Sequence, residues 1–165
     1  MSSQLEGHTV QRYDGELNSL HLRVVEMGGL AVDQLKTALH ALQDKDVQAA
    51  DVVIQREHEI DEMEIATDEE IVAVIAKRSP VARDLRVVMS ISKAITDLER
   101  VGDEAARVAH LAKEIYSGER SPPSQNMLRD VTTMGRVALG MLEEAVQSFD
   151  RLDMDQACRI ASNHG

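Results

Sequence analysis

Two acidic residues, Glu99 and Asp103, stand four positions apart in a stretch whose apolar residues follow a helical spacing. Residues at that separation share one face of a helix, where two like charges repel each other by roughly a few tenths of a kcal/mol. A hard cation bound by the carboxylate oxygens would remove this repulsion. Ion pairing with Arg100 or Arg107 would remove it as well. The spacing leaves both explanations open and, taken alone, favours ion pairing.

Gly102, between the two acids, adds to the argument for a site. Glycine weakens a helix by about 1 kcal/mol relative to alanine, but the missing side chain lets another helix or a ligand come close. Asp97 lies two positions before Glu99, so we expect it to point largely to another face, as a surface group or a group that supports the ligands.

A second acidic stretch covers residues 57–64, where Glu57 and Asp61 also stand four apart. They would contribute to a metal site or form a solvated acidic face. One alternative is a ferritin-like di-iron oxidase, which places a His three positions after a Glu on two helices. None of the six histidines follows a Glu at that spacing, so the sequence argues against this enzyme. A helical scaffold without metal remains the other alternative, and we expect no catalysis.

Apolar residues at steps of three and four predict the helices that hold these acids. After a polar arm of about twelve residues, a first helix carries an apolar stripe from Leu20 to Leu42. We expect Asp46 to cap a second helix over about 47–77. Pro80 is expected in the first turn of a third helix. The remaining predicted spans are about 83–115 for the third helix, about 125–149 for a fourth, and a fifth that begins after Asp153.

The sequence repeats itself at a shift of 107 residues. Met27-Gly28 meets Met134-Gly135, and the capping position Asp46 meets Asp153. The apolar stripe repeats in the pairs Val24/Val131, Ala31/Ala138, Leu35/Leu142, Ala38/Ala145 and Ala50/Ala157. Together these matches indicate a duplication. The first unit holds three predicted helices and the second only one and the start of another, so we expect that the chain is cut short before a second acidic helix.

Composition and charge exclude several classes of protein. The chain has 29 acidic and 18 basic residues, and a formal net charge of −11 disfavours direct binding to nucleic acid or to an anionic membrane surface. Aromatic residues make up only 2 %, so Ala, Leu, Val, Ile and Met side chains are expected to fill the core, and an all-α fold is favoured. Cys158 is the single cysteine. No signal-peptide core and no span of about 20 apolar residues is present, so we expect a cytoplasmic protein.

Several stretches resemble the PhoU family. They are Met27-Gly28, Ile60-Asp61, Asp84-Leu-Arg86, Ser90-Ile-Ser-Lys93 and Asp97-Leu-Glu99-Arg100-Val-Gly102-Asp103. The last stretch resembles the family signature, an acidic residue followed by three others and then Asp. The resemblance covers nearly the whole chain and implies tandem three-helix bundles. The first would be complete at residues 13–118, and a linker at 119–124 would join it to an incomplete second bundle at 125–165.

The same resemblance implies a metal site with iron or zinc, in which Glu99 and Asp103 are the ligands. Arg100 and Gly102 would complete the motif, and Asp61, Glu57 and Asp97 are further positions for ligands or for groups that support them. The implied role is that of a negative regulator of phosphate uptake and phosphate-starvation signalling. As a homodimer without catalytic activity, it would couple the ATPase side of the phosphate transporter to a sensor histidine kinase.

Overall fold

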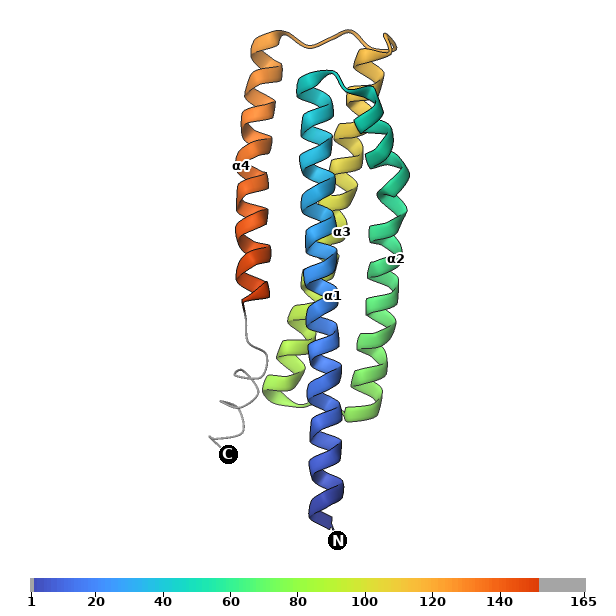
Figure 1. The fold of residues 1–165 in the computed structure, drawn as a ribbon, viewed down its shortest axis with the longest axis vertical. Helices are drawn as coiled ribbons and strands as arrows, with labels where there is room; N and C mark the ends of the chain where they lie inside the picture. Colours follow the sequence, from blue (N-terminus) through green and yellow to red (C-terminus); the bar gives the residue numbers. More distant parts are fainter. Residues whose placement is uncertain (1, 152–165) are drawn as a thin grey trace.

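The computed structural model describes residues 2–151, with side chains described from residue 14 onward. These residues form four long helices, and they contain no strand, which confirms the expected all-α fold (Figure 1). None of the helices in this part of the chain is both long and apolar enough to cross a membrane. The helices are α1 (Ser2–Asp44), α2 (Val47–Arg78), α3 (Ala82–Tyr116) and α4 (Gln125–Asp150).

Helices α1, α2 and α3 pack against one another as an up-down-up bundle, and α4 runs back alongside α1 (Figure 1). The half of the bundle away from the α1–α2 turn is filled by large aliphatic side chains, such as Leu20, Met27, Ile60, Ile91 and Ile95. The half near that turn is filled mainly by alanines, which allow the helices to approach closely, and these include Ala38, Ala41, Ala50, Ala105 and Ala109. The bundle thus has a core of Ala, Leu, Val, Ile and Met side chains, as the composition indicated.

The predicted cap of α2 is confirmed. Oδ1 of Asp46 accepts a hydrogen bond from the backbone N–H of Ala49 at 3.0 Å. The prediction for Pro80 is wrong, because Val81 is the N-cap of α3 and Pro80 therefore lies before the helix. Ser79 ends α2 in the left-handed region (φ 45°), so the chain turns over three residues before α3 starts.

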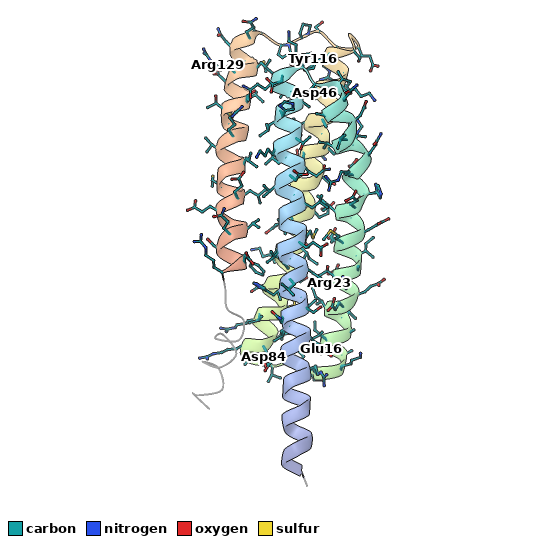
Figure 2. The ribbon with its side chains drawn as sticks, viewed as in Figure 1. Glu16, Arg23, Asp46, Asp84, Tyr116 and Arg129 are labelled. Atoms are coloured by element: carbon teal, nitrogen blue, oxygen red, sulfur yellow. The ribbon has the colours of Figure 1, made fainter. Side chains whose placement is uncertain are left out.

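The prediction of a polar arm is also wrong, since α1 begins at Ser2. Once a helix has been nucleated, each further residue adds a backbone hydrogen bond, so polar residues without a proline can extend it. An ion pair holds α1 to α2, because the Arg78 guanidinium donates to both carboxylate oxygens of Glu16 at 3.1 Å. Figure 2 shows Glu16 at the end of the bundle away from the α1–α2 turn.

Helix α4 follows a non-helical segment over 117–124, close to the predicted linker. Its apolar side chains are unevenly buried: Leu142 and Phe149 pack on the bundle core, whereas Met134 is 72 % exposed. The repeat matches Met134 to Met27, which is fully buried in α1. The division into two domains stays a prediction, and the expected fifth helix and the matches of Asp153 and Ala157 lie outside the described residues.

Candidate metal site

Close packing between α2 and α3 positions the acidic residues. Gly102 of α3 is buried, and a Cβ atom at that position would lie only 2.8 Å from Cδ1 of Ile60 in α2. The missing side chain therefore allows the two helices to approach, as the sequence predicted. Asp61 follows Ile60 and Asp103 follows Gly102, so this contact brings acids from both helices to one place.

Three carboxylates meet there. Asp61 from α2 and Glu99 and Asp103 from α3 each offer one oxygen, and these oxygens all lie within 4.8 Å of one another. All three residues are half-buried. Glu99 and Asp103 share a face because they are one helical turn apart, whereas the tertiary packing adds Asp61.

Burial, together with the neighbouring negative charges, makes ionisation of this group unfavourable. Burial raises the pKa of Glu99 to about 7, with hydrogen bonding to Asp103 and the negative charges of Asp103, Glu64 and Asp61 adding to the shift. Burial also raises the pKa of Glu64, and repulsion from Asp68, Asp61 and Asp103 adds to it. A cation that binds these carboxyl groups must displace the proton of Glu99, and its charge would then offset the repulsion between the carboxylates.

Ion pairing does not explain the acidic pair in this structure. Arg107 pairs with Glu104, at 2.7 Å between Nη1 and Oε1. No ion pair among the described residues joins Arg100 or Arg107 to Glu99 or Asp103. The alternative that the spacing favoured is therefore wrong here, and the repulsion within the group is left uncompensated by these arginines.

The structure places the other two predicted acidic positions outside the group of three carboxylates. Glu57 is outside the group of three, although it stands one helical turn before Asp61. Asp97 is outside it too, and it lines an apolar groove with Val24 and Leu142 on another side of α3. Sequence reasoning missed Glu64, whose charge acts on Glu99. The three-residue step from Asp61 to Glu64 on one helix was the available signal.

The donor set fits a hard cation. Three carboxylates supply only oxygen, which suits Mg²⁺, Mn²⁺ or ferric iron. Zinc in proteins is held mostly by nitrogen and sulfur, and within residues 14–151 no histidine or cysteine joins the group. Of the two metals that the resemblance implied, these residues therefore suit iron better than zinc.

Comparison with known proteins identifies relatives across the chain. Residues 24–112 match the model of a family described as PhoU domain. The chain is 38 % identical over 159 residues to the phosphate-specific transport system accessory protein PhoU of Escherichia coli K12, covering 96 % of this chain. It is also 38 % identical, over 157 residues, to a PhoU homolog of Pseudomonas aeruginosa. The chain spans 64 % of the length of each of these two relatives.

Solved structures show the same arrangement. The crystal structure of PhoU from Pseudomonas aeruginosa matches with a TM-score of 0.77 at 37 % identity, over 91 % of this chain and 70 % of that one. The phosphate transport system regulatory protein PhoU from Streptococcus pneumoniae matches with a TM-score of 0.73 at 29 % identity, over 91 % and 69 %. Sequence and fold thus point to the same relatives.

Proposed function

Because this chain belongs to the PhoU family, we propose that it acts as a regulatory accessory protein of phosphate transport rather than as an enzyme. The observation that carries the proposal is the likeness over 96 % of the chain to a protein named for that role. In the proposed role the protein restrains phosphate uptake and phosphate-starvation signalling when phosphate is plentiful.

The acidic group is the proposed cation site. Asp61, Glu99 and Asp103 would hold a hard cation, iron being the favoured one, and the cation would neutralise the group and tie α2 to α3. The closeness of the three carboxylates supports this assignment, and so does the raised pKa of Glu99, which burial causes and the neighbouring carboxylates increase. The metal-free scaffold is the alternative that metal analysis tests.

The proposed partners are proteins. The chain would contact the ATPase side of the phosphate transporter and a sensor histidine kinase, and it would do so in the cytoplasm as a homodimer. A net charge of −11 supports contact with basic protein surfaces and disfavours contact with nucleic acid. Control of gene expression would therefore be indirect.

A reporter of a phosphate-starvation promoter tests the role in a bacterial strain that lacks its own PhoU protein. We expect the wild-type chain to lower the reporter signal in phosphate-rich medium and the Glu99→Ala/Asp103→Ala variant to lose both this effect and bound metal. Glu57→Ala is the matched control, since Glu57 lies outside the group of three. An unchanged signal with the wild-type chain would contradict the regulatory role.

Two further outcomes separate the alternatives. Full repression by a Glu99→Ala/Asp103→Ala variant that carries no metal would support the metal-free scaffold. Sustained consumption of dioxygen by the iron-loaded protein would support the ferritin-like oxidase and overturn the proposal of a non-enzymatic regulator.

A further inference from the structure

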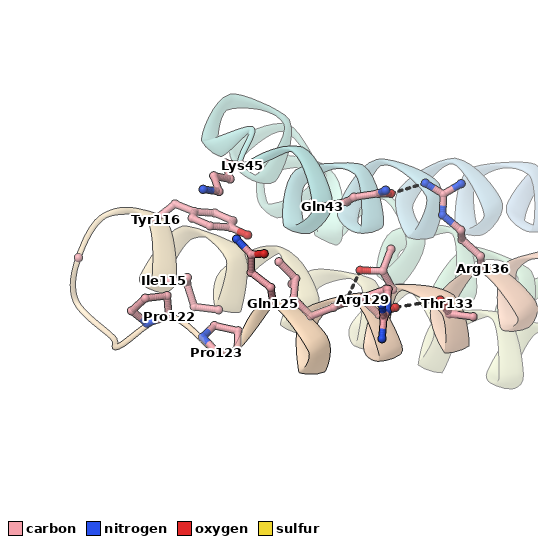
Figure 3. A pocket seen from close by; sticks show the side chains of 13 residues that line it. Gln43, Lys45, Ile115, Tyr116, Pro122, Pro123, Gln125, Arg129, Thr133 and Arg136 are labelled. Atoms are coloured by element: carbon pink, nitrogen blue, oxygen red, sulfur yellow. Dashed lines mark hydrogen bonds between the residues drawn. The ribbon is translucent and has the colours of Figure 1, made fainter.

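A groove of about 790 Å³ lies at the end of the bundle where α3 gives way to α4 (Figure 3). The end of α1, the end of α3, the 117–124 segment and the first turns of α4 surround it. Figure 2 shows Tyr116 and Arg129 at this end of the molecule, with Asp84 at the opposite end. The groove is thus remote from the start of α3.

The charged residues that line the groove are basic, whereas the chain as a whole is acidic. Lys45, Arg129 and Arg136 line the groove, and no acidic residue is among its lining residues. The whole chain, by contrast, has 29 acidic and only 18 basic residues. Three cations gathered in one concave surface of an acidic protein create a local field that attracts an anion.

None of these three cations is held by a short ion pair among the described residues. Arg136 donates to the amide oxygen of Gln43, which is neutral. The nearest carboxylate oxygen paired with Arg129 is 3.8 Å away on its neighbour Asp130, and both of these side chains are 73 % exposed. Lys45 forms no ion pair with the described residues. An exposed pair at that distance contributes little, so an arriving oxyanion would displace it readily.

The first turn of α4 adds to the attraction. Ser124 caps the helix by accepting a hydrogen bond from the N–H of Met127 at 3.2 Å. The positive end of the helix dipole therefore lies beside Gln125 at the groove. The helix dipole adds to the attraction of the three cations for an anion, and it would be too weak to hold an anion without them.

Part of the lining of the groove is apolar. This part includes Ile115, Tyr116, Pro122, Pro123 and Leu128. Figure 3 shows Ile115, Tyr116 and the two prolines near the 117–124 segment. The Tyr116 hydroxyl donates to the backbone oxygen of Leu42 at 2.5 Å, which holds the ring in place. An aromatic ring in the lining of a groove offers a flat surface on which an organic group can pack.

We propose that this groove binds the phosphate ester of a small organic group, of the size and kind of a nucleoside monophosphate. The phosphate would lie between Arg129 and Arg136, because guanidinium groups hold phosphate oxygens with paired hydrogen bonds. The organic group would pack on Tyr116 and the prolines. A volume of about 790 Å³ is typical of small-molecule sites and far exceeds the needs of inorganic phosphate. The proposal rests neither on the regulatory role nor on the cation site.

Isothermal titration of the metal-free chain with AMP, GMP, CMP and UMP at low ionic strength tests the proposal. We expect saturable binding of at least one nucleotide, weakened about tenfold or more in the Arg129→Gln/Arg136→Gln variant. The matched control is Arg83→Gln/Arg86→Gln, which removes the same charge from exposed positions on either side of Asp84 at the far end of the bundle. Its affinity should stay within about twofold of wild type.

Titrations with inorganic phosphate and with adenosine measure how much the phosphate and the organic group each contribute to binding. We expect phosphate to bind about tenfold or more weakly than the nucleotide, and adenosine to show no saturable binding. No nucleotide binding up to about 10 mM, or equal weakening by both double variants, would overturn the site. Inorganic phosphate that binds as tightly as the best nucleotide would overturn the organic part of the proposal.

Discussion

Gly28 of α1 lies directly against Val146 of α4, so that a Cβ atom at Gly28 would come within 2.9 Å of Cγ2 of that valine. Gly135 of α4 lies in the same manner against Leu39 of α1. Adding 107 to the numbers of Gly28 and Leu39 gives Gly135 and Val146, so the two contacts exchange under the internal repeat. The α1–α4 interface therefore includes two equivalent contacts, which supports a duplication.

The pair of adjacent glycines in α1 gives a prediction about stability. Gly29→Ala should raise the free energy of unfolding by up to about 1 kcal/mol, since nothing lies within 4 Å of an added Cβ and alanine favours the helix. Gly28→Ala should leave the protein about 1–3 kcal/mol less stable than Gly29→Ala, because the stiff side chain of Val146 blocks the added methyl group. Urea unfolding measures both.

Shortening the Val146 side chain is the control for the Gly28→Ala and Gly29→Ala variants. In the Gly28→Ala background, Val146→Ala should cost less stability than in the Gly29→Ala background, because it relieves the clash only in the first. Equal costs in the two backgrounds would show that the glycine–valine contact does not limit α1–α4 packing.

Cation binding should depend on pH. The pKa of Glu99 is raised to about 7 without a cation, so a bound cation must displace its proton below that pH. The dissociation constant of Mn²⁺, measured by titration calorimetry, should fall by up to about tenfold per pH unit as pH rises toward 7 and then level off. Glu57→Gln should keep this profile, and Glu99→Gln should weaken binding and flatten it. A pH-independent affinity in the wild type would contradict the assignment.

The stability of the metal-free protein should decrease as pH rises, whereas the affinity for a cation should increase. The pKa of Glu99 is raised from 4.5 to about 7 on folding, so between these values the folded state binds more protons than the unfolded state. The free energy of unfolding should therefore decline as pH rises from about 4.5 to 7. Chemical denaturation across this range should show a smaller decline for Glu99→Gln, which cannot ionise. An equal decline in both proteins would assign the effect to other groups.

The cap of α2 provides a prediction about a single hydrogen bond. Asp46→Ala removes the acceptor of the Ala49 N–H and should cost about 1 kcal/mol of stability. Asp46→Asn keeps an oxygen in the same place and should cost less than half as much. Thermal unfolding of the two variants side by side measures the difference, and equal losses would show that the charge, which also faces His40 at 3.2 Å, matters more than the cap.

Local patterns predicted the helices well, because apolar residues at steps of three and four define a face through the geometry of a single helix. The α2 cap was found for the same reason, since Asp46 acts on Ala49 only three residues away. Pro80 was misplaced because a proline starts a helix or precedes it at similar positions in sequence. The start of α1 was missed because polar residues join a helix that the bundle has already nucleated.

The sequence by itself determined that Glu99 and Asp103 share a face, since a spacing of four is fixed by helix geometry, and its resemblance to one family indicated the fold. Only the tertiary structure decided that Asp61 rather than Glu57 joins them and that Lys45 and Arg129 meet at one groove. Which residues of different helices lie close together depends on how the helices are rotated and shifted against one another. Packing contacts between residues far apart in the chain set that register, and no local spacing encodes it.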